Sequence, residues 1–170
     1  MESLAIFPSF INGTVPTNIG NNPEWELGFD FMARIGLAVL AGLLIGLERE
    51  FKGKPAGLKT NMLVSLGACT FMSLSLQFQG GDYIDITRVL GQVVIGVGFL
   101  GGGVILKKGN TIEGLTTAAT VWCSAAAGCI AAMYLVGNLI LFIAMVVAIN
   151  IVFGYMDSKI KQNKNKDHKK

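Results

Sequence analysis

Five long apolar runs, separated by short charged or turn-forming segments, constrain this chain more than any other feature of its sequence. A helix needs about 20 mostly apolar residues to cross the hydrocarbon core of a bilayer, and each run is about that long. Charged residues make up only 15% of the 170 residues, against about a quarter in soluble domains. The sequence therefore predicts an all-α membrane protein with five transmembrane helices. We place these helices at about residues 29–47, 61–78, 89–106, 115–136 and 138–156.

The basic residues predict the orientation of these helices through the positive-inside rule. Twelve Lys and Arg residues fall in the first loop, the third loop and the tail, whereas the opposite side holds Arg88, with Arg34 inside the first span. With five spans, all three basic segments are cytoplasmic if the N-terminus is outside. We therefore expect an extracytoplasmic lead-in over 1–27, a transmembrane domain over 28–156 and a basic cytoplasmic tail over 157–170. The lead-in has no basic residue and so does not resemble a secretory signal peptide.

A twelve-residue phrase occurs twice, 57 residues apart, as GLKTNMLVSLGA from Gly57 and as GLTTAATVWCSA from Gly114. The same ungapped shift aligns Gly46 with Gly103, which gives both loops ten residues. We interpret the pattern as two pseudo-repeated helical hairpins followed by a fifth helix, a parallel repeat of the kind that some transporters use. Chance matching of apolar segments is the alternative. In each copy the first glycine would permit a sharp entry, and the threonine three residues later could cap the re-entering helix.

Glycines are expected to supply the close contacts between helices, because lipid gives helices no hydrophobic reason to associate. GxxxG spacing occurs in the first span and again in the third, and the third span holds six glycines. Each of them weakens the helix and needs a compensating close contact. The predicted helix-packing residues are Gly42, Gly46, Gly96, Gly98, Gly102 and Gly103.

Helical spacing gathers polar groups on one face of the third span and one face of the fourth. The third span combines a cation, an amide and bare backbone in Arg88, Gln92, Gly96, Phe99 and Gly103. The fourth span carries hydroxyls and a thiol in Thr116, Thr117, Thr120, Cys123 and Ser124. If the two faces meet, they enclose a narrow polar seam. This seam is either ordinary helix packing with local hydroxyl-to-carbonyl hydrogen bonds, or a small polar pocket or ion path.

Charges at the two ends of the first span leave alternatives open. Arg34 lies four residues after Asp30, the favourable order for an ion pair, and its side chain can also snorkel outward. Glu48 and Arg49, at the cytoplasmic end, are either ordinary interfacial charges or fold under the turn. In that second case they would pair with Lys59 or with the acidic residue of the sister loop.

The sequence shows no signature of an enzyme. It has no Ser/His/Asp set, no phosphate-binding loop and no His/Cys spacing for a metal, so we expect no catalysis, cofactor or metal site. The three cysteines fall in apolar runs and are expected to be free thiols. Six lysines sit in the last twelve residues, which is not the distribution of a nucleic-acid-binding surface.

Two segments, IGLEREFKGKPAGLKTNMLVSLGA and RVLGQVVIGVGFLGGGVILKKGNTIEGLTTAATVWCSAAAG, resemble the MgtC/SapB family of bacterial inner-membrane proteins. The similarity covers about residues 34–136. It implies a five-span protein of the bacterial cytoplasmic membrane that is linked to magnesium limitation and to survival inside host cells. It also implies a regulatory role, acting on the F-type ATP synthase or on other membrane proteins, in place of magnesium transport.

The resemblance further implies functional positions at Trp122 and Cys123 in WCSAA, and at Glu48 and Arg49 in GLERE. Thr116 stands where virulence-type members often carry Asn. Many members also carry a soluble C-terminal domain, where this chain has a lysine tail. These two differences favour a short, SapB-like form.

Two functions remain open from the sequence. The first is a non-enzymatic membrane regulator of divalent-cation or membrane-energy homeostasis, acting through helix contacts in a homodimer or with another membrane protein. The alternative is a Mg²⁺ or H⁺ transporter or channel subunit with a polar path between the third and fourth spans. The acidic residues lie at the membrane edges, which argues against a magnesium path, because Mg²⁺ seeks carboxylates.

Overall fold

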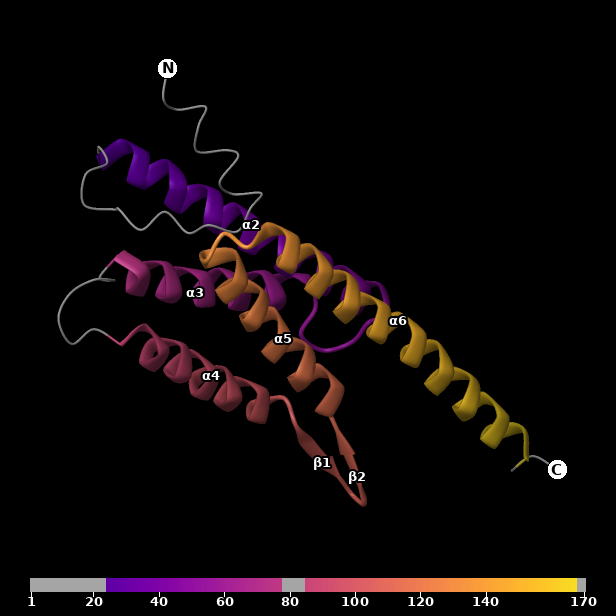
Figure 1. The fold of residues 1–170 in the computed structure, drawn as a ribbon. Helices are drawn as coiled ribbons and strands as arrows, with labels where there is room; N and C mark the ends of the chain where they lie inside the picture. The colour runs from indigo at the N-terminus through magenta and orange to yellow at the C-terminus, as the bar shows by residue number, and fades with distance from the viewer. Residues whose placement is uncertain (1–23, 78–84, 168–170) are drawn as a thin grey trace.

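A computed structural model describes the chain over residues 24–77 and 85–167 (Figure 1). The helices of these described residues are α2 Glu24–Phe51, α3 Leu58–Gln77, α4 Ile86–Gly103, α5 Leu115–Ala132 and α6 Val136–Asp167. An antiparallel hairpin of two short strands, β1 Leu106–Lys108 and β2 Thr111–Glu113, joins α4 to α5. The predicted five helices are confirmed, and the hairpin is an addition that the sequence did not predict. The predicted lead-in, up to residue 23, lies outside the described residues.

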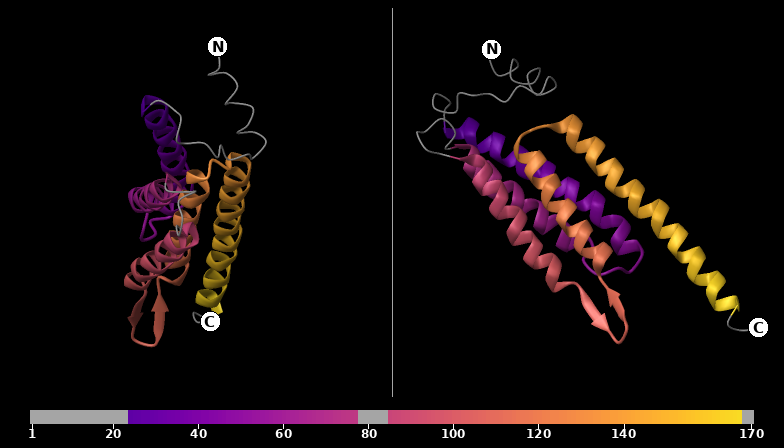
Figure 2. Two further views of the ribbon diagram at one scale, coloured as in Figure 1. Left: turned by 60° about the vertical axis from the view of Figure 1, so that its left-hand side comes forward. Right: turned by 60° about the horizontal axis from the view of Figure 1, so that its bottom comes forward.

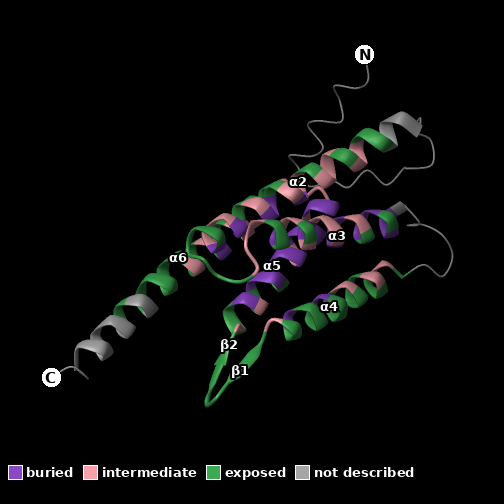
Figure 3. Ribbon diagram, turned by 180° about the vertical axis from the view of Figure 1, so that it is seen from behind, coloured by how far each residue is buried: buried purple, intermediate pink, exposed green. Residues whose placement is uncertain are grey.

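α5 is the central helix of the bundle, since it contacts each of the other four described helices. α2 and α3 form an antiparallel pair against it, while α4 packs on α3 and α5, and α6 packs on α2 and α5 (Figures 1 and 2). The burial pattern agrees with this arrangement: α5 is largely buried, whereas α4 and α6 are mostly exposed (Figure 3). In a membrane protein these exposed apolar faces are the surfaces that lipid or a partner covers.

Four of the five described helices are long and apolar enough to cross a membrane, namely α2, α4, α5 and α6. α3 is less apolar because it turns polar side chains inward, toward α2 and α5. Asn61 and Ser65 are fully buried on it, while Leu63 and Phe71 are exposed. The span predicted at 61–78 therefore corresponds to a helix of sufficient length, and its place in the membrane stays a prediction.

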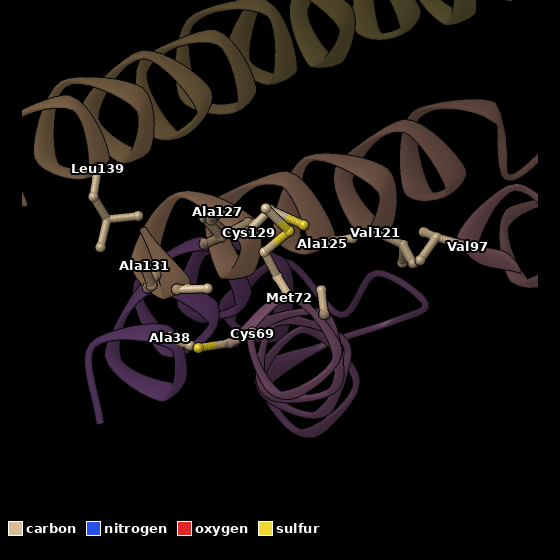
Figure 4. Close-up of a cluster of buried hydrophobic side chains, with 14 of the residues drawn as sticks. Ala38, Cys69, Met72, Val97, Val121, Ala125, Ala127, Cys129, Ala131 and Leu139 are labelled. Atoms are coloured by element: carbon tan, nitrogen blue, oxygen red, sulfur yellow. The ribbon is translucent and has the colours of Figure 1, made fainter. Parts of the chain in front are cut away.

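The core is built from small side chains, which allows the helices to approach closely (Figure 4). Ala38 of α2, together with Ala127 and Ala131 of α5, has no exposed surface. Val97 of α4 and Val121 of α5 point toward each other at the edge of this cluster (Figure 4). Alanine offers little apolar area, so the bundle depends on close backbone contact more than on large side chains.

The predicted bounds of the last spans need correction. α5 ends at Ala132, and the chain turns through Tyr134, whose φ is +61°. The spans predicted at 115–136 and 138–156 put the turn at Gly137, but Gly137 lies in the first turn of α6. α6 then continues as helix through residues 157–167, most of the segment predicted as a separate tail.

The starts of the two re-entering helices follow the sequence repeat, whereas the connections that precede them do not. Both re-entering helices begin one residue after the repeated glycine, at Leu58 and at Leu115. The connections differ, because α2 runs on to Phe51 before a short turn, whereas α4 stops at Gly103 and the hairpin follows. The alignment of the helix starts agrees with duplication, which itself stays a prediction.

Candidate functional site

A cluster of buried hydrogen bonds ties α5 to α2 and α3, near the end of the bundle that carries the α2–α3 turn. The Nη2 atom of Arg49 donates to the Thr117 hydroxyl at 2.7 Å. The Ser124 hydroxyl donates to Oδ1 of Asn61, also at 2.7 Å. All four side chains are buried, so each bond forms in a medium of low dielectric and is favoured over contact with lipid.

Asn61 connects this cluster to the turn that precedes α3. Its amide nitrogen donates to the carbonyl oxygens of Ala56 (2.6 Å) and Gly57 (2.8 Å). Ala56 adopts a left-handed conformation with φ +53°, and the amide holds this turn in place. The sequence analysis missed Asn61. The repeat could have indicated it, because Asn61 is a polar residue of the first copy where the second copy has the apolar Ala118.

Arg49 folds under the turn, as one of the two alternatives for the cytoplasmic end of α2 required. It is 5% exposed, and its partner is Thr117, not Lys59 or Glu113. Glu48 pairs instead with Lys52 of its own helix at 2.5 Å. The structure therefore confirms a buried arginine at this position and corrects its partner.

The threonine caps expected at the two re-entry points are absent from the described helices α3 and α5. At α3 the carboxylate of Glu50 accepts from the Leu58 N–H at 3.0 Å. At α5 the N-cap is Gly114, with φ +94° and no side-chain hydrogen bond. Thr117 faces Arg49, so the position that was predicted to cap the helix serves as an interhelical partner instead.

The polar seam predicted between α4 and α5 is wrong in its location. On α4 the residues Arg88, Gln92, Gly96 and Gly103 are exposed, and Phe99 is 83% exposed. The face that meets α5 carries Val97 and Gly101 instead. Its polar counterpart on α5, formed by Thr117, Thr120 and Ser124, turns toward α2 and α3.

The other predicted residues of α5 lie outside the buried cluster. Thr116 and Trp122 are exposed, the latter at 48%. Cys123 is half-buried. Thr120 is buried and donates to the Thr116 carbonyl oxygen, a bond within its own helix. The WCSAA segment is thus divided between the lipid-facing surface and the interior.

The predicted packing glycines also divide into two groups. A Cβ on Gly42 would lie 2.5 Å from the carbonyl oxygen of Asn61, and a Cβ on Gly46 would lie 2.8 Å from the Cα of Leu58. These two are confirmed as close contacts between α2 and α3. Gly96, Gly98, Gly102 and Gly103 of α4 have open space at the Cβ position among the described residues, so packing within the chain does not explain them.

Gly128 of α5 is a close contact that the sequence analysis missed. A Cβ there would collide with the carbonyl oxygen of Ser65 and would lie 3.1 Å from the Cβ of Ala68. It brings the backbones of α3 and α5 together. A single glycine among alanines gives little signal in one sequence.

Arg34 has a different partner from the one predicted. Its guanidinium donates to the carbonyl oxygen of Ala132 and lies 5.5 Å from the ring centroid of Tyr134. A cation beside the last carbonyls of a helix satisfies otherwise unpaired acceptors. Arg34 therefore fixes the end of α5 against α2. Among the described residues, no group of three or more His, Cys, Asp or Glu could hold a metal ion.

The fold and this buried polar cluster define a helical membrane protein with several apolar spans. The sequence assigns it to a particular family. A family model described as the MgtC family matches residues 35–159, and the chain belongs to this family.

Curated relatives agree with this placement. The chain is similar to protein MgtC of Brucella abortus, with 45% identity over 113 residues that cover 66% of this chain and 47% of the relative. It is similar to protein SapB of Bacillus subtilis, with 41% identity over 62% of this chain and 48% of the relative. It is also similar to protein MgtC of Salmonella typhimurium, with 37% identity over 82% of this chain and 59% of the relative.

The chain spans about half the length of the curated relatives that it matches. The identities to MgtC and SapB relatives are close to each other, so they do not separate the expected SapB-like form from an MgtC-like one. No solved structure matches the chain.

Proposed function

We propose that this chain is a non-enzymatic protein of the bacterial cytoplasmic membrane that regulates divalent-cation or membrane-energy homeostasis through contacts with membrane partners. The link to magnesium comes from the MgtC/SapB resemblance. The mode of action comes from the way in which the polar side chains are distributed over the bundle.

The observation that carries the proposal is the separation of the two polar stripes. On α5 the interior hydroxyls are occupied, since Thr117 accepts from Arg49 and Ser124 donates to Asn61. On α4, Gln92 and Phe99 face outward. A path for Mg²⁺ would need oxygen ligands and water along its length, whereas these side chains are hydrogen-bonded to one another.

The outward face of α4 is the surface that we assign to partner binding. It combines bare backbone at Gly96 and Gly103 with an exposed aromatic, Phe99, and an amide, Gln92. Small residues allow a second helix to approach closely in lipid, and an amide can hydrogen-bond across the contact. The partner helix would come from a second copy, giving a homodimer, or from another membrane protein such as the F-type ATP synthase that the resemblance implies.

We also propose that the N-terminus is outside and that the basic loops are cytoplasmic. The α2–α3 turn, the β1–β2 hairpin and the C-terminal part of α6 lie at the same end of the bundle (Figures 1 and 2). Apart from Arg34 and Arg88, the described basic residues lie in these segments or in the adjoining helix ends, where Arg49 belongs to α2 and Lys59 to α3. Their common location supports the positive-inside assignment.

Flux measurements test the absence of conduction. The purified chain is reconstituted in liposomes, and Mg²⁺ and H⁺ entry are recorded with internal dyes. We expect the rate of protein-free liposomes. Robust flux that Thr117→Val abolishes would overturn the regulatory proposal and favour a transporter.

Site-specific photocrosslinking tests the α4 surface in intact membranes. A photoreactive amino acid at Phe99 is expected to give a crosslinked product. The same group at Phe71, an exposed aromatic on α3, is the matched control and should give none. Equal crosslinking at both positions, or none at Phe99, would contradict the assignment of this face.

A further inference from the structure

A cavity of about 900 Å³ lies at the basic end of the bundle, and its wall includes the Arg49–Thr117 and Glu48–Lys52 pairs described above. Its walls come from three places in the sequence: the end of α2 with its turn (residues 48–55), β2 with the first turn of α5 (112–117), and α6 (149–156). Figure 2, in its right-hand view, shows the α2–α3 turn between the lower end of α5 and the middle of α6. This volume falls in the range of pockets that bind small molecules.

Two buried N–H donors in the wall lack a protein partner. Arg49 is 5% exposed, and no hydrogen-bond partner reaches its Nε among the described residues. The same holds for Nδ2 of Asn150, on the α6 wall. A buried donor without a partner is unfavourable, so an acceptor bound in the cavity would be stabilised by hydrogen bonds from these two groups.

The first turn of α5 adds further donors. The N-cap of this 18-residue helix is Gly114, which has no side chain, so the first backbone N–H groups have no capping oxygen from their N-cap residue. Gly114 and the three residues after it line the cavity. A helix N-terminus that faces a cavity favours an anion through its N–H groups and its dipole.

The charges of the wall also favour an anion. Its two carboxylates are each paired with a lysine: Glu48 with Lys52 at 2.5 Å and Glu113 with Lys108 at 2.9 Å. Arg49 and Lys54 line the cavity in addition, which leaves a positive excess.

Apart from Asn150, the α6 wall is largely apolar. Ile149, Phe153 and Met156 of α6 line the cavity and are about half exposed or more. They lie within the apolar span of α6, which ends at Met156. A free phosphate ion would leave these apolar side chains uncovered, whereas the acyl chains of a lipid would cover them.

We propose that this cavity binds an anionic phospholipid through its headgroup phosphate. The N-terminus of α5, Arg49 and Lys54 surround the phosphate, and an acyl chain lies along α6. A headgroup with hydroxyls also satisfies the other polar atoms, since one hydroxyl accepts from Asn150 and another donates to Oε2 of Glu48, which lacks a protein partner among the described residues. This site is separate from the α4 surface and does not depend on the proposed function.

The first experiment identifies the source of the phosphate. The full chain is purified in a mild detergent, and its Tm is measured with added phosphatidylglycerol, phosphatidylcholine or inorganic phosphate. We expect a saturable rise in Tm with phosphatidylglycerol and no comparable rise with the other two. An equal rise with phosphatidylcholine would overturn the proposal, as would a saturable rise with inorganic phosphate alone, which would assign the cavity to a free ion.

The second experiment places the lipid in the cavity with a matched pair of charge variants. Lys54→Gln removes a cation from the cavity wall, and Lys107→Gln removes one from β1, outside the cavity but at the same end of the bundle. We expect about a fivefold loss of apparent affinity for phosphatidylglycerol in the first and no change in the second. Equal losses would show a bulk charge effect and would overturn the site.

A third variant separates headgroup binding from folding. Asn150→Leu removes the unpartnered amide, so the lipid-free protein should be as stable as wild type or more stable. The rise in Tm with phosphatidylglycerol should fall in this variant. An undiminished rise would contradict the proposed headgroup contact at α6.

Discussion

Gly42 and Gly46 of α2 have the same GxxxG spacing as Gly98 and Gly102 of α4, but the structure uses the two pairs differently. A Cβ at Gly42 would lie 2.7 Å from the Cα of Met62, whereas a Cβ at either α4 glycine would have open space among the described residues. The first pair therefore holds α2 against α3 within the chain. The second pair lies on the outward face of α4, which no other described residue covers. The same spacing thus permits a close contact without specifying whether the contact is internal.

The largest expected effect compares these two pairs directly. Gly42→Ala should destabilise the bundle by about 3 kcal/mol, because the added methyl group meets backbone atoms of α3 that cannot move without separating the helices. Gly102→Ala should raise stability by about 0.5 kcal/mol, since alanine favours helix and nothing opposes it. Unfolding of the two variants by sodium dodecyl sulfate in mixed micelles measures both. Equal destabilisation would show that α4 is packed internally.

The second prediction compares the two re-entry corners. Gly114→Ala should cost about 2 kcal/mol, because its φ of +94° is strained for any other residue and a Cβ would collide with the carbonyl group of Val104. Gly57→Ala should cost less, about 1 kcal/mol, because it displaces only the flexible Glu50 carboxylate that caps α3. The same unfolding assay ranks the two variants. A reversed order would mean that the corners are not built as described.

The third prediction compares two adjacent threonines of α5. Thr117→Val should cost about 1.5 kcal/mol, because it leaves the buried Arg49 guanidinium without its hydroxyl acceptor. Thr116→Val, on the exposed side of the same turn, should stay within about 0.5 kcal/mol of wild type. Thermal unfolding in detergent separates the two. A neutral Thr117→Val would show that the hydrogen bond contributes nothing to stability.

The smallest effect concerns how α4 begins. The N-cap Asp85 has a lowered pKa, mainly through the hydrogen bond from the Thr87 hydroxyl, so its contribution is complete above the unfolded-state pKa of about 4. That contribution is lost as the pH falls through the lower folded-state pKa. Wild type should therefore exceed Asp85→Asn in Tm at pH 6, and the difference should shrink as the pH falls below about 4. A pH-independent difference would contradict a role for the ionised carboxylate.

The sequence could predict the elements of this fold because each depends on local patterns. Apolar runs of spanning length give the five helices, and the repeated glycines mark the starts of α3 and α5 at Leu58 and Leu115. The hairpin between α4 and α5 was missed because the equal loop lengths suggested equal loops. The two strands are joined by a two-residue turn in which Gly109 has a φ of +60°. Each strand has only three residues, which is too short for a strand pattern to be recognised in the sequence.

The candidate site was harder to predict, because periodicity shows which residues share a face but not which neighbour the face meets. Thr117 and Ser124 were correctly placed together on α5, yet their partners are Arg49 and Asn61, from the other hairpin. α5 touches every other described helix, so a stripe on it has several possible neighbours. Only the three-dimensional arrangement selects among them.

α3 has a consequence for how the chain is inserted during synthesis. Of the five described helices it alone is not among the four most clearly apolar ones, and Asn61 and Ser65 are buried on its interior face. An unpaired polar group is costly in hydrocarbon, and Asn61 finds its acceptor and donor partners only in the turn and on α5. The Oδ1 atom of Asn61 gains its Ser124 donor only when α5 has been synthesised, so we expect the α2–α3 pair to reach its full stability only after α5 has joined the bundle.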